Sequence, residues 1–270
     1  MYIPEIGCDS CDYTLQEVDL GNMGHVDKSL VLAVETSGRK GSAAVGIGDQ
    51  ILARRTLSGR LRHGCELLTC CSDLIESIGG RPSDIANICI SAGPGSFTGI
   101  RIAVTIGKIM NFACDAKIIP LSTMDVLAEN VVESPPPAEG ISPDRKKPKI
   151  RNIATILDAK RGQFYVALFE RRHGGWRKSV NDCLMTSSQF VGRFAGGEKT
   201  IWLLGEGLVY CADQFAGERI ALLDESCWHP RAENVYKLGT EKAKQGNFAD
   251  PLTLTPHYLR GPQAVVKQRT

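Results

Sequence analysis

The chain has 270 residues, of which 43% are hydrophobic and 23% charged, and its formal net charge is +2. It can therefore bury a sizeable core, as one large domain or as two of ordinary size. It contains no run of 18 or more apolar residues and no basic start followed by an apolar leader, so we expect no membrane span, no secretory signal and a cytoplasmic location.

Residues 1–29 form an acidic, weakly patterned extension. The first 27 residues hold six acids and no Lys or Arg, which leaves a surplus of eight positive charges on the rest of the chain. Such a surplus suits a polyanionic partner such as RNA. The extension also holds Cys8 and Cys11, a lone pair without a second Cys/His pair at zinc-finger spacing. The ten cysteines form no disulfide framework, which favours reduced thiols.

The N-terminal half alternates strands and helices. An apolar run at 30–34 is followed by a polar turn at 35–41, and strands at 42–47 and 51–57 complete a meander. A helix is predicted at 64–78 by an apolar stripe with a period of 3.6 residues, and Gly79-Gly80 ends it. A strand at 87–91, a helix at 100–113, a strand at 117–119 and a helix capped by Ser122 and running to about Val132 follow.

The stretch Ala92–Arg101 joins a buried strand to a helix and is rich in glycine and hydroxyl side chains. Its backbone N–H groups favour an anion, because they lie at a helix N-terminus. Its sequence does not match the motif of a Walker loop, of a Rossmann loop or of a serine nucleophile elbow. We therefore favour a capped turn over a phosphate site: Ser96 or Thr98 caps the helix, and the glycines allow close packing.

A proline-rich, basic segment at 134–149 divides the chain. It includes Arg145-Lys146-Lys147, with Lys149 and Arg151 nearby, and a solvated linker explains this run more simply than an RNA contact does. Beyond it the pattern restarts with a strand at 153–157, a polar turn at 158–162 and a strand at 164–169. We expect an N-terminal lobe at 30–133 and a second lobe at 150–265, and for the last helix we consider packing back on the first lobe.

Each half begins with an apolar strand, an acidic turn and a return strand. This weak repeat is typical of duplicated α/β proteins of the actin, sugar kinase and Hsp70 type, which bind a ligand between their lobes. In that arrangement Glu35 and Asp158 face each other across the cleft. The alternative is that each acid is only a turn former.

Five segments together resemble the bacterial TsaB proteins in order and spacing, over roughly residues 30 to 265. They are Leu32–Ser37, Ala92–Arg101, Leu121–Met124, Leu157–Tyr165 and Pro256–Arg260. The resemblance implies an α/β fold with two lobes, the duplicated actin-like or ribonuclease H-like (ASKHA) fold. The extension at 1–29 lies outside it.

The resemblance also implies a function. TsaB proteins are non-catalytic subunits that pair with a TsaD-like catalytic paralogue and work with a TsaE-like ATPase. The complex transfers a threonylcarbamoyl group to the adenosine beside the anticodon of tRNA. We therefore expect this chain to require no cofactor of its own, ATP and magnesium being used by the partners, to meet tRNA through the complex, and to form a homodimer when the partner is absent.

Site residues follow from the same resemblance. We expect no catalytic residue and no metal ligand, since the five histidines stand far apart in the sequence and form no His-x-x-x-His pair. Glu35 stands where the family usually has Asp, and the extra methylene alters the geometry around a magnesium ion. The residues of a vestigial nucleotide cleft are expected to be Glu35, Thr36, Ser37, Gly93, Gly95, Ser96, Thr98, Gly99, Asp158, Arg161 and Gly162.

The partner surface is expected on the helices of the N-terminal lobe, at Leu67, Leu68, Cys71, Leu74, Ile75, Ile78, Ile102 and Ile106. The same stripe can equally face the core, and the sequence does not divide these roles. An alternative function is an active ATP-dependent kinase or carbamoyl-type transferase of the same fold, with Glu35 and Asp158 around magnesium. A metallopeptidase is disfavoured because the histidine pair is missing.

Overall fold

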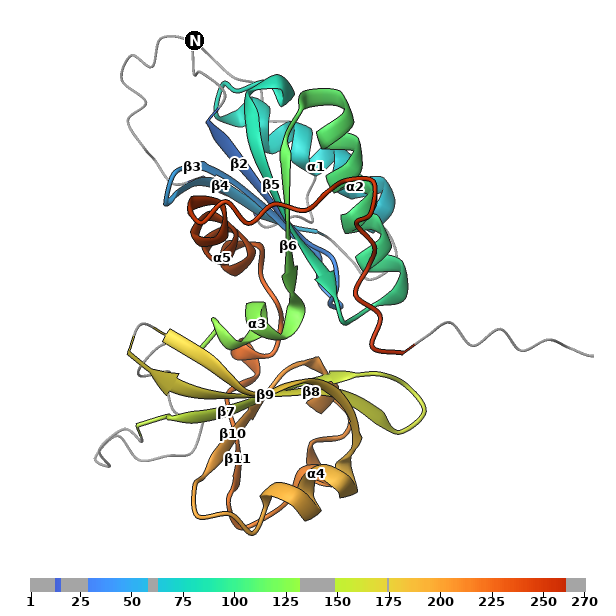
Figure 1. Cartoon of the computed structure of the whole chain (residues 1–270), viewed down its shortest axis with the longest axis vertical. Helices are drawn as coiled ribbons and strands as arrows, with labels where there is room; N and C mark the ends of the chain where they lie inside the picture. The colour runs from blue at the N-terminus through green and yellow to red at the C-terminus, as the bar shows by residue number, and fades with distance from the viewer. Residues whose placement is uncertain (1–12, 16–28, 58–62, 132–148, 174, 261–270) are drawn as a thin grey trace, which may run out of the picture.

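A computed structural model describes residues 13–15, 29–57, 63–131, 149–173 and 175–260, and it shows two lobes, each built on one mixed sheet (Figure 1). The strands are β1 (Tyr13–Leu15), β2 (Leu30–Glu35), β3 (Ser42–Ile47), β4 (Gln50–Thr56), β5 (Ile85–Gly93), β6 (Lys117–Ser122), β7 (Asn152–Asp158), β8 (Gln163–Arg172), β9 (Gly175–Thr186), β10 (Ile201–Leu204) and β11 (Ile220–Leu222). The α-helices are α1 (His63–Ser77), α2 (Phe97–Cys114), α3 (Thr123–Ala128), α4 (Ser187–Phe194) and α5 (Ala232–Lys244). Short 3-10 helices are η1 (Pro82–Asp84), η2 (Glu206–Leu208), η3 (Ala212–Phe215) and η4 (Glu225–Cys227).

The two sheets repeat one topology. Their strand orders are β4-β3-β2-β5-β6 and β9-β8-β7-β10-β11, and in both the first three strands are antiparallel while the last two run parallel to the central one. The internal repeat expected from the sequence is thus present in the fold. Within the acidic extension, β1 adds to the edge of the first sheet by pairing with β4. The rest of residues 1–28 lies outside the described residues, as do residues 132–148, which include all of the expected linker except Lys149.

Helices α1 and α2 cover one face of the first sheet, and α5 covers the other (Figure 1). The inner faces of α1 and α2 are apolar because Leu67, Leu74, Ile100 and Ala103 recur at helical spacing, and all four are buried. By length and composition α2 could cross a membrane, but its inner half is packed into this core.

Some boundaries differ from those expected. Helix α2 begins at Phe97 rather than Ile100, because the Ser96 side chain accepts a hydrogen bond from the Gly99 N–H and caps the helix there. Helix α3 begins after the expected Ser122 cap but ends at Ala128, four residues early. Beyond it, the Asn130 amide donates to the carbonyls of Cys227 and His229, which directs the chain away from the helix axis.

The lobes are not continuous in sequence. Met124 and Leu127 of α3 pack in the core of the second lobe, although they lie before the linker. Conversely, α5 packs on β2, β3, β5 and β6 of the first lobe. Gly239 permits this approach, because a Cβ at that position would overlap the Cys89 sulfur on β5. Residues 245–260, here the C-terminal strap, then cross the edge of β6, where Ala249 bridges to Ile118, and run down beside α2 toward the second lobe (Figure 1).

Candidate functional site

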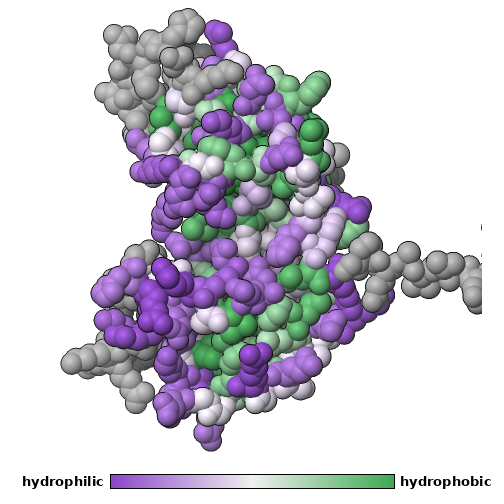
Figure 2. Space-filling view, in the orientation of Figure 1, coloured by the Kyte–Doolittle hydropathy of each residue, from purple (hydrophilic) through white to green (hydrophobic). Residues whose placement is uncertain are grey.

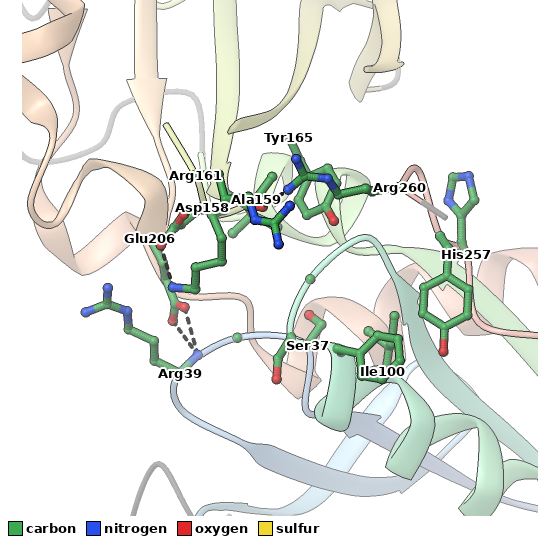
Figure 3. A pocket seen from close by; sticks show the side chains of 17 residues that line it. Ser37, Arg39, Ile100, Asp158, Ala159, Arg161, Tyr165, Glu206, His257 and Arg260 are labelled. Atoms are coloured by element: carbon green, nitrogen blue, oxygen red, sulfur yellow. Dashed lines mark hydrogen bonds and ion pairs between the residues drawn. The ribbon is translucent and has the colours of Figure 1, made fainter. Parts of the chain in front are cut away.

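A cleft of about 760 Å³ lies between the lobes (Figure 3). It is formed by the turn after β2, the start of α2, the β7–β8 turn, η2 and the end of the C-terminal strap. The lining residues are Ser37, Gly38, Arg39, Gly95, Ser96, Phe97, Ile100, Leu157, Asp158, Ala159, Lys160, Arg161, Tyr165, Glu206, His257, Tyr258 and Arg260. Five of the eleven expected cleft residues are among them: Ser37, Gly95, Ser96, Asp158 and Arg161.

Glu35 does not face Asp158 across this cleft. Its side chain is fully buried beneath the turn, where one carboxyl oxygen bonds the backbone N–H and hydroxyl of Ser37 and the other bonds the Ser91 hydroxyl. Burial raises the pKa of Glu35, and it outweighs the hydrogen bonds from Ser37 and Ser91 that lower it. The expected position of Glu35 in the cleft wall is therefore corrected: Ser91 of the neighbouring strand bonds its side chain, and the glycine-rich loop packs on the turn above it.

The glycine-rich loop packs against the turn that follows Glu35. The Thr36 hydroxyl donates to the Gly99 carbonyl at 2.8 Å, and the Ser96 N–H donates to the Ser37 carbonyl at 2.8 Å. A Cβ at Gly99 would overlap the Thr36 carbonyl oxygen, and one at Gly95 would lie 2.6 Å from the Ser37 carbonyl oxygen. These glycines thus serve close backbone packing, as the capped-turn interpretation expects.

The remaining expected cleft residues lie behind the wall or beside it. Thr36 and Gly99 are buried in the contact just described, and Gly93 is buried under the strap, with the His257 carbonyl 2.7 Å from the position of a Cβ. Thr98 is exposed and Gly162 has open space around it, but neither lines the cleft.

The β7–β8 turn is open by comparison. Lys160, Arg161 and Gly162 all have positive φ, at 65°, 56° and 70°. This tight reversal brings the Lys160 backbone N–H and ammonium to the two Asp158 oxygens, at 2.7 and 2.6 Å. Burial alone would raise the pKa of Asp158, but the hydrogen bonds and charge of Lys160, with the more distant charge of Arg39, outweigh it and lower the pKa.

Glu206, at the start of η2, lines the cleft from the second lobe. It was not among the residues expected from the sequence. Both of its carboxylate oxygens accept the Arg39 backbone N–H, at 2.9 and 2.7 Å, and the His229 Nδ1 lies 2.6 Å from Oε1 (Figure 3 shows the contact with Arg39). Its side chain is only 7% exposed. A lone acid 167 residues from its partner carries no local sequence signal.

The C-terminal strap supplies the third wall and joins the two lobes. The His257 N–H donates to the Ala92 carbonyl at 2.8 Å, and the Arg101 guanidinium donates to the Tyr258 hydroxyl at 2.8 Å. Arg260 reaches the second lobe, donating to the Ala159 carbonyl at 3.1 Å and to the Gln163 side chain at 2.9 Å. The Pro256–Arg260 segment, quoted for its family resemblance, thus has a structural role as a tie.

The expected partner surface is mostly core. Leu67, Cys71, Leu74, Ile75 and Ile106 are buried in the first lobe, and Ile78 and Ile102 are partly buried against the same core. Only Leu68 is exposed, at 50%. Helix α2 also exposes Phe97, at the cleft, and Ile109 and Phe112 farther along, of which Phe112 is 92% exposed; none of the three was among the expected residues. The stripe predicted by periodicity therefore faces inward, as an amphipathic helix on a sheet requires.

The described residues contain no group of three or more His, Cys, Asp or Glu side chains placed to hold a metal ion. Cys8 and Cys11 lie outside these residues. Around the cleft, Asp158 is engaged by Lys160, and Glu206 by Arg39 and His229. This arrangement does not fit a magnesium ion held between Glu35 and Asp158.

A family model described as TsaD, tRNA N6-adenosine threonylcarbamoyltransferase, matches residues 50–245. The chain belongs to this family. Within it the chain groups with TsaB proteins. The tRNA threonylcarbamoyladenosine biosynthesis protein TsaB of Bacillus subtilis is 25% identical over 240 residues, covering 88% of this chain and 96% of the relative. The protein of the same name from Escherichia coli is 25% identical over 234 residues, covering 85% and 94%.

Solved structures agree on the fold. YeaZ from Pseudomonas aeruginosa superposes with a TM-score of 0.70 at 23% identity, covering 86% of this chain and all of that one. A second Pseudomonas aeruginosa structure, described as similar to peptidase YeaZ, gives a TM-score of 0.71 at 22% identity. The two-lobed α/β architecture of the TsaB family is therefore the fold of this chain, and the resemblance drawn from the sequence is confirmed.

Proposed function

We propose that this chain is a non-catalytic subunit in the biosynthesis of threonylcarbamoyladenosine in tRNA, working beside a TsaD-like catalytic paralogue and a TsaE-like ATPase. Membership of the TsaD family, with relatives named for this modification, is the observation that carries the proposal. The carboxylates of Asp158 and Glu206 in the cleft accept hydrogen bonds from the protein itself, which supports the non-catalytic part, because a magnesium-nucleotide site needs open oxygen ligands.

Three exposed apolar residues of α1 and α2 that lie outside the cleft lining are proposed as the contact with the paralogue, in place of the buried stripe. Leu68, Ile109 and Phe112 are 50%, 44% and 92% exposed. Large apolar side chains on a surface helix are typical of an interface with another protein. The same surface would support a homodimer when the paralogue is absent.

Depletion of the protein, followed by nucleoside analysis of digested bulk tRNA, tests the function. We expect the modified nucleoside to disappear and to return when the wild-type chain is supplied. Phe112→Asp should restore it poorly and should fail to co-purify with the TsaD-like protein, whereas Phe248→Asp, at a 38% exposed aromatic on the strap, should behave as wild type. An unchanged nucleoside profile after depletion contradicts the proposal.

The alternative of an ATP-dependent kinase or carbamoyl-type transferase makes a different prediction. It requires tight binding of Mg-ATP by the isolated chain, which calorimetry measures directly. We expect no binding heat.

A further inference from the structure

Basic side chains gather at the end of the second sheet that lies farthest from the cleft. Strands β7, β10 and β11 are parallel and begin at this end, whereas β8 ends and β9 begins there. The topology therefore collects residues from four separate chain segments, because the end of β8 and the start of β9 form one hairpin. We call the exposed bases among them the basic end: Lys149, Arg151, Arg172, Arg177, Lys199 and Arg219.

Acids only partly neutralise the basic end. Glu170 accepts hydrogen bonds from Arg172 at 2.7 Å and from Lys199 at 3.2 Å. The other acids beside these strand ends are Glu198 and Glu218, both exposed. Among the described residues no carboxylate pairs with the other four members, Lys149, Arg151, Arg177 and Arg219. Six bases against three acids form a local positive excess in a chain whose formal net charge is only +2.

The basic end is broad and polar. Its five strands are separated by four spacings of about 4.8 Å, so it spans roughly 19 Å from β9 to β11. Figure 2 shows hydrophilic side chains gathered at the left of the lower lobe, where Figure 1 places the start of β9. None of the large apolar residues exposed in the described part of the chain lies here, the nearest in sequence being Leu222 at the opposite end of β11.

The charge and polarity of the basic end indicate which kind of partner it binds. A membrane-binding surface combines bases with exposed apolar side chains that enter the lipid, and this surface has none. A phosphodiester backbone needs only an array of Lys and Arg over several phosphates.

We propose that the basic end binds the phosphate backbone of RNA. Resting on the proposed function, the RNA is the tRNA that the complex modifies, and this chain contacts it directly as well as through its partners. Recognition of this kind positions the RNA and carries little sequence information.

Fluorescence anisotropy with a labelled tRNA transcript and the full chain tests the proposal, from 50 to 200 mM salt. The test variant is Arg177→Glu/Arg219→Glu, which reverses one base at each edge of the basic end. The matched control is Arg81→Glu/Lys242→Glu on the first lobe, which changes the net charge equally. Thermal melting followed by circular dichroism verifies that both variants fold.

We expect the test variant to bind roughly ten-fold more weakly than wild type, and its salt dependence to lose about two units of slope in log Kd against log salt. The control should stay close to wild type. Equal losses in both variants would show that only net charge matters, and unchanged binding in the test variant would show that RNA lies elsewhere; either result overturns the proposal.

The two proposals fail separately. If depletion leaves the nucleoside profile unchanged while the test variant still loses RNA binding, the modification role is wrong and the RNA surface stands. If depletion removes the modified nucleoside but the test variant binds tRNA as wild type does, the modification role stands and the basic end is not the contact.

Discussion

The turn after β2 and the turn after β7 occupy matching positions in the two sheets and start from similar sequences. Their acidic side chains nevertheless lie in different environments. Glu35 is fully buried and held by hydroxyl and backbone donors of its own lobe. Asp158 lies in the cleft wall and accepts hydrogen bonds from the backbone and side chain of Lys160. Burial raises the pKa of Glu35, whereas Lys160 lowers that of Asp158.

The difference comes from what packs over each turn. The loop at 93–99 packs on the first turn. The Ser96 N–H donates to the Ser37 carbonyl, and the Thr36 carbonyl leaves no room for a Cβ at Gly99. On the second turn, the Arg260 side chain from the strap donates to the Ala159 carbonyl and to the Gln163 side chain. An acidic turn in a duplicated fold is thus a ligand candidate only when no distant loop closes over it, which the turn sequence itself does not reveal.

Disrupting the packing on the first turn should have the largest effect on the free energy of unfolding. Gly99→Ala forces a Cβ onto the Thr36 carbonyl, so we expect a loss of about 3 kcal/mol or more in the free energy of unfolding. Gly162→Ala in the second turn meets open space and suffers only its positive φ, which is worth about 1 kcal/mol. Urea denaturation of both variants measures the contrast, and equal losses would contradict the tight packing of the first turn.

Removing the Glu206 contact, one of the links between the lobes, should have an intermediate effect on stability. Glu206→Ala leaves the Arg39 N–H without its acceptor, so we expect a loss of about 1–3 kcal/mol and faster hydrogen exchange at residues 38–40. Glu170→Ala removes an exposed acid with two ion pairs and should change neither quantity noticeably. Fast exchange in both variants would mean that Glu206 does not hold the lobes.

The two acids should respond to pH with opposite signs. The pKa of Glu35 is raised in the folded state, so its contribution to stability is present at low pH and is lost as pH rises through that pKa. The pKa of Asp158 is lowered, so its contribution is present at higher pH and is lost as pH falls through that pKa. With rising pH, Glu35→Gln should gain stability relative to wild type and Asp158→Asn should lose it. Denaturant titrations from pH 3 to pH 8 measure both differences, and a shared sign would contradict the assigned environments.

The smallest effect on stability is expected from substitution of Lys160. Its side chain is 78% exposed, so Lys160→Ala should barely change stability, but the substitution removes a hydrogen bond and a charge that lower the pKa of Asp158. That pKa should rise when followed by NMR of the side-chain carboxyl. Lys160→Arg keeps the charge and should leave the pKa lower than Lys160→Ala does; identical titrations would exclude Lys160 as the cause.

Local pattern predicted most of the fold of the first lobe. Apolar runs gave β2 and β5, and helical periodicity gave α1, because these signals lie within one element. The site was predicted in part. Ser96 and Asp158 carry local turn chemistry, whereas the burial of Glu35 and the placement of Glu206 depend on contacts 56 and 167 residues away. Such contacts are decided by how the lobes meet, which no window of sequence contains.

Helix α5 has a consequence for synthesis on the ribosome. The face of the first sheet that it covers, with Val31, Ala33, Cys89 and Ile119, is made early, while the covering residues Val235 and Tyr236 are made near the end of the chain. Until α5 has been synthesised, this apolar face lacks the helix that covers it in the folded protein. A fragment that stops at the linker would keep it open, so the smallest unit expected to fold independently is discontinuous, and chaperones would meet this face during translation.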